Sequence, residues 1–349
     1  MVDPPDLGAE ALDLVRKYLM VDEPWIEHGD RCVAWVGYRL RQEIRAEKPY
    51  QDREFNLVRV SVTVPIVDAV HAAPDEVDSL LGDVNRYAVG AMYLYDSSTK
   101  SIFSFVAVTL HTDTLDWRAK QLSILATCQL GFAETEADYL AHASRGEVAR
   151  RSHPMLGQRK TPDEMLRFAD SVFGREGNFP SRYSAKSEFE SIERIIENIN
   201  AVTWGASEDG IAIELPFDQG TSLISIHADE PHPLLGNGLT VNTFLRLEKN
   251  PLILSKAAAK LRTREWAGEC PTQCFGAWGA IRHLNGVLFL GHTVFFPNVL
   301  YLGGIVGGIF VEARIRAQWV NSILNPGVPE AEVRKIDLEG FSKKPDGSS

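Results

Sequence analysis

The stretch Cys274–Phe296, CFGAWGAIRHLNGVLFLGHTVFF, decides the fold predicted for this chain. It reads as two strands joined at Asn285-Gly286, because Asn-Gly between apolar runs is the strongest short signal for a β-hairpin. The sequence from residue 299 to Leu324 then predicts a long helix, which ends before Asn325-Pro326-Gly327. The unit that closes the chain is therefore a hairpin followed by a long helix.

The first half of the chain has the same order of elements. Two apolar runs, Tyr87–Tyr95 and Ser101–Leu110, are joined by DSSTK, and a long helix is expected from about Asp113 to Ala143. Upstream, each half reads as a helix, three strands and a helix. The fold class predicted is therefore α+β. It consists of two copies of a helix–three-strand meander–helix–hairpin–helix unit, with antiparallel sheets that carry helices on one face.

Two sets of residues recur in these copies. Trp25 is followed five residues later by Asp30, and Trp204 is followed five residues later by Asp209. Gly90-Ala91 in the first hairpin matches Gly276-Ala277 in the second. A diverged internal duplication explains these matches, and a chance coincidence of two common α+β patterns is the alternative. Under duplication, we expect both tryptophans to be buried where the first helix meets the meander.

A chain of 349 residues exceeds what one core usually holds, so two domains are expected. The predicted division is a first domain over 1–144, a basic linker with a short helix over 145–184, a second domain over 185–326 and a tail over 327–349. The linker is rich in basic residues from Arg145 to Lys160. We interpret that run as an exposed, solvated connection; a docking site for an acidic partner is the alternative.

The composition favours a cytoplasmic protein that binds no nucleic acid. Its net charge of −11 argues against a general binder of nucleic acids or anionic membranes. The four cysteines are too few and scattered for a disulfide framework, and the acidic N-terminus does not resemble a signal peptide. Residues Leu284–Val311 carry no Asp, Glu, Lys or Arg, but they read as strand, break and helix start. We therefore expect no stable membrane insertion.

No catalytic, cofactor or metal site is predicted. The glycines near residue 304 lack the GxxxxGK[ST] pattern of a phosphate loop, and close helix packing explains them better. A loop with His227, Asp229, Glu230 and His232 has the ligand types of a zinc site but no known spacing, so a polar surface loop is preferred. Cys270 and Cys274 are interpreted as partly buried thiols.

The order of the elements resembles the type III secretion chaperone-like fold of Tir-type chaperones and YbjN-like proteins. The resemblance is carried by the WxxxxD segments, the Gly-Ala hairpin strands and the closing long helices. HPLLGNGL (His232–Leu239) also resembles a loop of tandem, actinobacterial-type members. The resemblance covers most of the chain in two copies, apart from residues 145–184. It implies a non-catalytic role in holding or regulating a partner polypeptide.

Three functions remain open at this stage. The first is a chaperone or adaptor whose sheet face or edge takes a protein or peptide client. The second is a small-ligand sensor with a pocket between the copies, and the third is a hydrolase or transferase whose site has no recognised motif. The candidate packing or partner-interface residues are Gly304, Gly307, Gly308, Trp25 and Trp204. The glycines predict that the last helix packs on the long helix of the first domain or on another protomer, which would give a homodimer.

Overall fold

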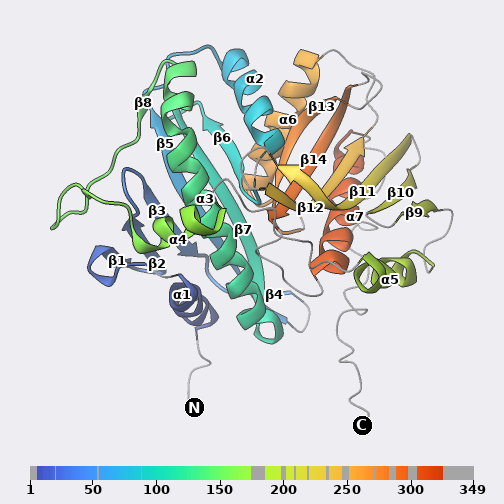
Figure 1. Cartoon of the computed structure of the whole chain (residues 1–349), viewed down its shortest axis with the longest axis horizontal. Coiled ribbons are helices and arrows are strands. Elements are labelled where there is room, and N and C mark those ends of the chain that lie inside the picture. The colour runs from blue at the N-terminus through green and yellow to red at the C-terminus, as the bar shows by residue number, and fades with distance from the viewer. Residues whose placement is uncertain are drawn as a thin grey trace, which may run out of the picture.

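The computed structural model describes residues 6–19, 21–52, 55–87, 89–173, 185–197, 202–207, 210–217, 220–232, 236–245, 251–270, 272–282, 288–297 and 305–324. Within these ranges the chain has an α+β fold with two antiparallel sheets and seven α-helices (Figure 1). The predicted fold class is confirmed at this level. The turn expected at Asn285-Gly286 lies outside the described residues. In the described part, no helix is both long and apolar enough to cross a membrane.

The first sheet has the strand order β1-β2-β3-β5-β7-β6. Its strands are β1 (Ile26–Gly29), β2 (Cys32–Val36), β3 (Arg41–Ala46), β5 (Phe55–Asp68), β6 (Met92–Asp96) and β7 (Ser101–His111), and both β4 (Tyr50–Asp52) and β8 (Glu147–Val148) pair with β5. Alternation places four valines of β5 on one face, where Val58, Val60, Val62 and Val64 are fully buried.

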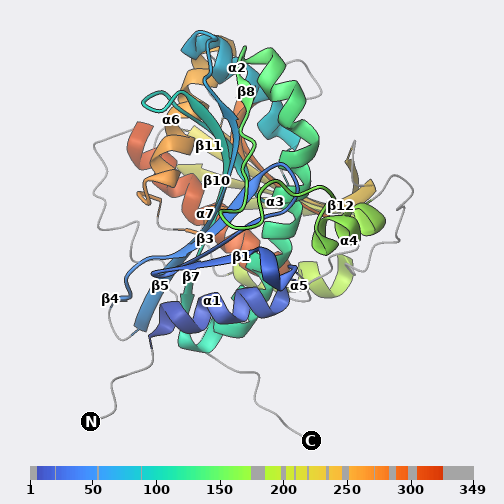
Figure 2. The ribbon, with the colours of Figure 1, turned by 90° about the vertical axis from the view of Figure 1, so that its left-hand side faces the viewer.

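Two helices cover that valine face. They are α1 (Leu7–Tyr18) and α3 (Leu115–Ala143), which lie next to each other (Figure 2). Ser123 Oγ of α3 donates a hydrogen bond to the Val15 carbonyl of α1 at 3.2 Å. Gln129 Nε2 of α3 donates to the Val62 carbonyl of β5 at 3.2 Å. Both helices are therefore fixed by buried polar contacts as well as by apolar packing.

The second sheet has the order β9-β10-β11-β12-β14-β13. Its strands are β9 (Thr203–Ala206), β10 (Gly210–Phe217), β11 (Gly220–His232), β12 (Gly236–Leu245), β13 (Ala277–Arg282) and β14 (Leu288–Pro297), accompanied by α5 (Ala185–Ile196), α6 (Pro251–Trp266) and α7 (Ile305–Leu324). Each half thus has a meander of four strands, where the sequence predicted three. The additional strands are β1 and β9, because each WxxxxD segment provides a short strand and not merely a turn.

The two halves pack closely on each other. Ala107 of β7 and Cys274 form an isolated antiparallel bridge, and the Phe103 and Trp266 rings meet edge to face at 5.2 Å between centroids. Phe295 of β14 packs in one apolar cluster with Cys128 of α3. Helix α2 (Pro74–Val84) lies against α6. Phe103 and Ala107 lie on the face of β7 opposite the valine face, so this contact covers part of a first-sheet face that was expected to remain free.

Residues 147–173, here called the strap, pack on the first sheet instead of forming an exposed linker. The strap contains β8 and ends in α4 (Glu164–Phe173). Three of its backbone N–H groups donate to carbonyls of the first sheet and its loops: Ala149 to Ile66 at 2.8 Å, Arg151 to Arg39 at 2.9 Å and Asp163 to Gly37 at 2.8 Å. The expectation of solvated basic residues holds for Arg145 and Lys160, which are exposed, but is wrong for Arg159, which is 8% exposed.

Candidate functional site

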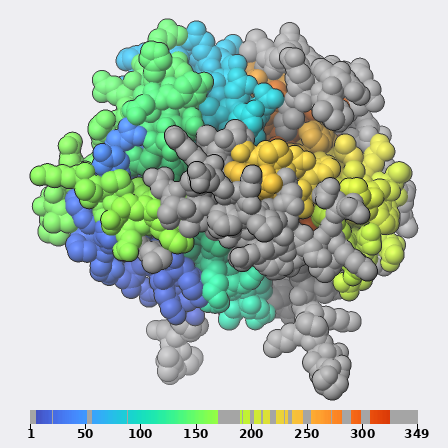
Figure 3. Space-filling view, in the orientation of Figure 1, coloured from blue at the N-terminus to red at the C-terminus, as the bar shows by residue number. Residues whose placement is uncertain are grey.

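The strand β9 forms one edge of the second sheet. Among the described strands it pairs only with β10, and its four residues are all exposed. In Figure 3 the yellow-green surface formed by α5, β9 and β10 lies at the right-hand side of the molecule. The sequence of β9, TWGA, carries no charge. We call β9 the open edge.

Trp204 is the large side chain of the open edge. It is 40% exposed and lies opposite Ile213 of β10, which is fully buried. Cross-strand partners share a sheet face, so Trp204 lies at the margin of the helix-covered face. Thr203 and Gly205 lie on the other face, where Thr203 is opposite the exposed Glu214. A Cβ added at Gly205 would meet nothing within 4 Å.

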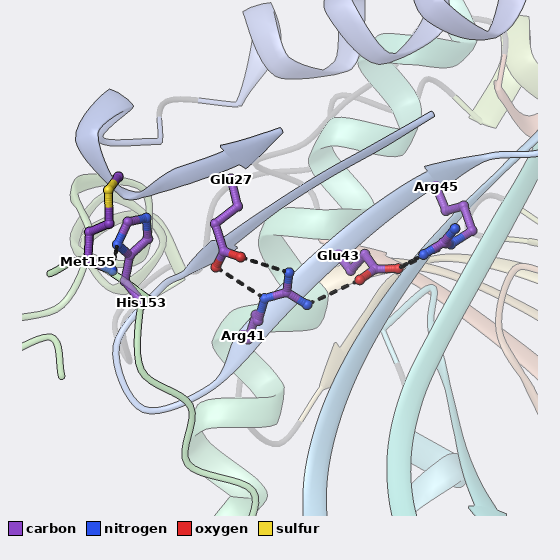
Figure 4. Close-up of polar contacts among 6 residues, drawn as sticks. All are labelled: Glu27, Arg41, Glu43, Arg45, His153 and Met155. Atoms are coloured by element: carbon purple, nitrogen blue, oxygen red, sulfur yellow. Dashed lines mark hydrogen bonds and ion pairs between the residues drawn. The ribbon is translucent and has the colours of Figure 1, made fainter. Parts of the chain in front are cut away.

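The corresponding edge of the first sheet is β1, which carries charge. Glu27 accepts hydrogen bonds from Arg41 at 3.4 and 3.2 Å, although Arg41 lies two strands away on β3 (Figure 4). Arg41 also bonds Glu43 at 3.1 Å, and Arg45 bonds Glu43 at 2.8 Å. Burial raises the pKa of Glu43, but the hydrogen bond and charge of Arg45 together with Arg41 outweigh it and leave the pKa below its ordinary value. We call β1 the guarded edge.

The strap covers Trp25 next to the guarded edge. The Arg159 guanidinium lies over the Trp25 ring at 4.7 Å from its centroid, and the His153 ring meets it edge to face at 5.8 Å. Arg159 is held by ion pairs with Asp22 and, at 2.9 Å, with the fully buried Asp163. His153 Nδ1 accepts N–H groups of the following turn, including that of Met155 at 3.2 Å (Figure 4).

The prediction for the two tryptophans is therefore wrong for Trp204, which is exposed, and needs correction for Trp25. The ring contacts described for Trp25 are with the strap, not with α1. The hairpin registers explain the difference. Gly29 pairs with Cys32 across two residues, whereas Ala206 pairs with Ile211 across four. The same WxxxxD spacing therefore leaves Trp25 outside the strand, at the end of the 3-10 helix Glu23–Trp25, and places Trp204 inside β9.

Of the glycines expected to form a close contact in the last helix, Gly308 does not form one with the described residues. Gly304 lies outside the described residues, Gly307 is half-buried, and a Cβ added at Gly308 would meet nothing within 4 Å. A described contact between α7 and α3 is instead ionic, between Glu312 and Arg118 at 3.0 Å. An interface with another protomer at the glycines stays a prediction.

The acidic and histidine-rich loop is part of β11, where a register shift separates His227 from Glu230. His227 is half-buried and Glu230 is exposed, while the Asp229 side chain lies outside the description. His232 is 8% exposed and its ring contacts Tyr87 and aromatic side chains of both halves (Phe132 and Phe295). Its Nε2 lies 3.0 Å from the Tyr87 carbonyl. Among the described residues, no group of three or more His, Cys, Asp and Glu side chains could hold a metal ion.

A buried ionic cluster lies where the second half meets the first, and sequence reasoning missed it. Glu265 of α6 is fully buried; it accepts hydrogen bonds from Arg316 Nε of α7 at 2.8 Å and from Trp278 Nε1 at 3.0 Å. Arg59 of β5 donates to the Glu265 carbonyl at 3.2 Å. The cluster ties α6, α7 and β13 to the first sheet. The amphipathic spacing of α7 could have indicated a buried face, but nothing marked Arg316 as part of it.

Both cysteines of the second half adjoin this cluster as free thiols. Cys270 is 7% exposed and Cys274 is 2% exposed, so both are more deeply buried than the partly buried thiols that were expected. Burial and the nearby Glu265 raise the pKa of Cys274 to about 11, although Arg59 opposes the shift, and raise that of Cys270 further. Such thiols are poor nucleophiles, because the reactive species is the thiolate.

Of the candidate interface residues, the structure thus leaves Trp204 on an exposed edge and places Trp25 under the strap. Trp25 directly precedes β1 of the first sheet and Trp204 lies in β9 of the second sheet, so they do not form one site. No family model matches the chain, and neither a curated protein nor a solved structure matches it. Function is therefore inferred from the geometry of the two sheet edges.

Proposed function

We propose that this chain is a non-catalytic, chaperone- or adaptor-like protein that binds an extended segment of a partner polypeptide at the open edge. The observation that carries the proposal is an uncharged edge strand with a tryptophan 40% exposed. In antiparallel pairing, alternate residues of an edge strand direct their N–H and C=O groups outward, which is a template for another strand. Strand addition supplies main-chain hydrogen bonds, and Trp204 supplies an apolar anchor.

We also propose that the halves are two copies of one secretion-chaperone-like unit. Support comes from the matching strand orders, β1-β2-β3-β5-β7-β6 and β9-β10-β11-β12-β14-β13, and from helices in equivalent places. In this proposal the copies have diverged in role. The first copy carries the strap and the guarded edge, and the second copy offers the open edge to a client.

Affinity capture with matched variants tests the proposal. The bait is the full chain, compared with Trp204→Ala and with Gly205→Lys, which places a charge on the edge where there is room for it. Trp266→Ala is the control, because Trp266 is also 40% exposed but lies at the end of α6. We expect a polypeptide that is captured by the wild type and the control and lost with both edge variants, all four proteins melting cooperatively. Capture that survives both edge variants, or is lost equally in the control, would refute binding at β9.

A further inference from the structure

We infer that the segment bound at the open edge is basic, with lysine or arginine alternating with apolar residues. This inference rests on the proposed function and names the chemistry of its partner. It follows from the charges of the elements beside β9 and from a contact that the first sheet already makes.

The first observation is that, in the described parts of α5, β9 and β10 and the residue after α5, exposed carboxylates outnumber exposed basic side chains, of which Arg194 is one. Glu214 is exposed on β10, next to β9, and Glu190 and Glu197 are exposed on and just after α5, which packs against β10. None of these three carboxylates has an ion-pair partner in the described part of the chain. The acidic charge of the whole chain, −11, acts in the same direction. An approaching acidic segment is repelled, and a basic one is attracted over about 8 Å at physiological salt.

The second observation concerns which side chains of an added strand meet these charges. Residues of the added strand alternate between the two faces of the sheet. Those on the Trp204 face pack on the indole ring, and those on the opposite face lie beside Thr203 and Gly205. Both are small, so a long side chain can cross β9 toward Glu214. Strands lie about 4.8 Å apart, so the added backbone is about 10 Å from β10, a gap that extended lysine and glutamate side chains close together.

The third observation is that the first sheet already contains an ion pair between side chains two strands apart. Arg41 on β3 reaches over β2 to bond Glu27 on β1 at 3.2 Å (Figure 4). The β2 residue opposite Glu27 is the small Ala34. A base on one strand and an acid two strands away therefore pair across a small residue in this protein. At the open edge the acid (Glu214) and the small residues are present, and a bound segment would supply the base.

Fluorescence anisotropy with labelled synthetic peptides tests the inference. The probe is the octapeptide Lys-Val-Lys-Tyr-Lys-Val-Lys-Val, compared with the same sequence carrying Glu for Lys and with a block-ordered peptide of identical composition. We expect the alternating lysine peptide to bind at least tenfold more tightly than either comparison peptide. Trp204→Ala and Gly205→Lys should each weaken its binding at least tenfold, and Glu214→Lys should remove the preference for lysine over glutamate. Glu10→Lys on α1 is the control, because it changes the net charge equally at an exposed position on the first half.

The outcomes separate the inference from the proposed function. If the glutamate peptide binds as tightly as the lysine peptide and Gly205→Lys blocks both, strand addition survives and the basic partner is refuted. If Glu10→Lys weakens binding as much as Glu214→Lys, or the block-ordered peptide binds equally, only net charge is at work and the inference fails. If no peptide binds, or if Gly205→Lys has no effect, the proposed function fails as well.

Discussion

The guarded edge and the open edge occupy equivalent ends of two sheets with the same strand order. They differ in how far their side chains are protected from solvent. At the guarded edge, Glu27 is ion-paired and the strap covers the neighbouring Trp25. At the open edge, Trp204 is exposed beside uncharged residues. Unprotected sheet edges invite pairing with other chains, and proteins commonly protect them with charges or covering loops. We therefore propose the open edge, and not the guarded edge, as the binding surface.

Removal of Arg159 should have the largest effect, because it would expose the guarded edge to solvent. The side chain is 4% exposed and pairs with a fully buried aspartate, Asp163. Arg159→Ala leaves that carboxylate buried without its partner, which costs about 3–5 kcal/mol. Urea unfolding should show this loss, whereas Arg150→Ala, at an exposed strap position, should change the free energy of unfolding by about 0.5 kcal/mol or less. Equal stability of the two variants would show that the strap does not hold this edge.

Truncation of the two tryptophans should lower the free energy of unfolding by different amounts at the two edges. Trp25→Ala removes a half-buried ring and its cation–π contact with Arg159, so we expect a loss of about 1–3 kcal/mol. Trp204→Ala removes an exposed ring, so we expect a change of about 0.5 kcal/mol or less. Thermal or urea melts of both variants measure these values. A larger loss for Trp204→Ala would place its ring in the core, in conflict with an open edge.

Low pH should destabilise the junction between the halves by protonating His232. This histidine is distant in the sequence from the ion pairs of the guarded edge. Burial lowers the pKa of His232 from 6.5, and the bond to the Tyr87 carbonyl opposes this only partly. The unfolded chain therefore takes up this proton at higher pH than the folded chain does. The stability contributed by neutral His232 is complete above about pH 6.5 and is lost as the pH falls below it.

His232→Phe isolates this contribution, because other buried histidines remain in both proteins. The difference in free energy of unfolding between wild type and His232→Phe should shift steadily against the wild type as the pH falls from 7.5 to 5. Chemical denaturation at several pH values measures it. A difference that stays constant over this range would mean that His232 titrates equally in the folded and unfolded chain.

The smallest effect is expected at the ion pairs of the guarded edge. The side chains of Glu27 and Arg41 are 24% and 30% exposed, so their pair is partly screened by solvent. Glu27→Ala should lower the free energy of unfolding by about 1 kcal/mol or less, and added salt should shrink the difference further. Melts at low and high ionic strength provide the measurement. A loss as large as that of Arg159→Ala would make the ion pairs, and not the strap, the main protection of this edge.

The fold class could be predicted from the sequence because the spacing of apolar residues in each segment indicates a helix or a strand. The apolar runs of β6 and β7 are local signals, and the structure forms strands within them as expected. The exposure of Trp204 could not be predicted in the same way. It depends on a hairpin loop that is two residues longer than that of the first half, although the WxxxxD spacing is the same.

The role of the strap also could not be read from local pattern. A run of arginines with a proline and a glycine is typical of a solvated linker. Whether Arg159 is exposed or buried depends on Asp22 and Asp163, and on an indole ring more than a hundred residues earlier in the chain. The same holds for Glu265 and Arg316, which lie on helices about fifty residues apart and meet only in the folded protein.

Amide hydrogen exchange of β9, with β1 as the internal reference, tests the difference between the two edges most directly. The rates of residues 203–206 and 26–29 are measured in the full chain with and without the alternating lysine peptide. Pairing of a strand at the open edge should slow exchange in residues 203–206 and leave residues 26–29 unchanged. Slower exchange at residues 26–29, or no change at either edge while the peptide is bound, would contradict the account.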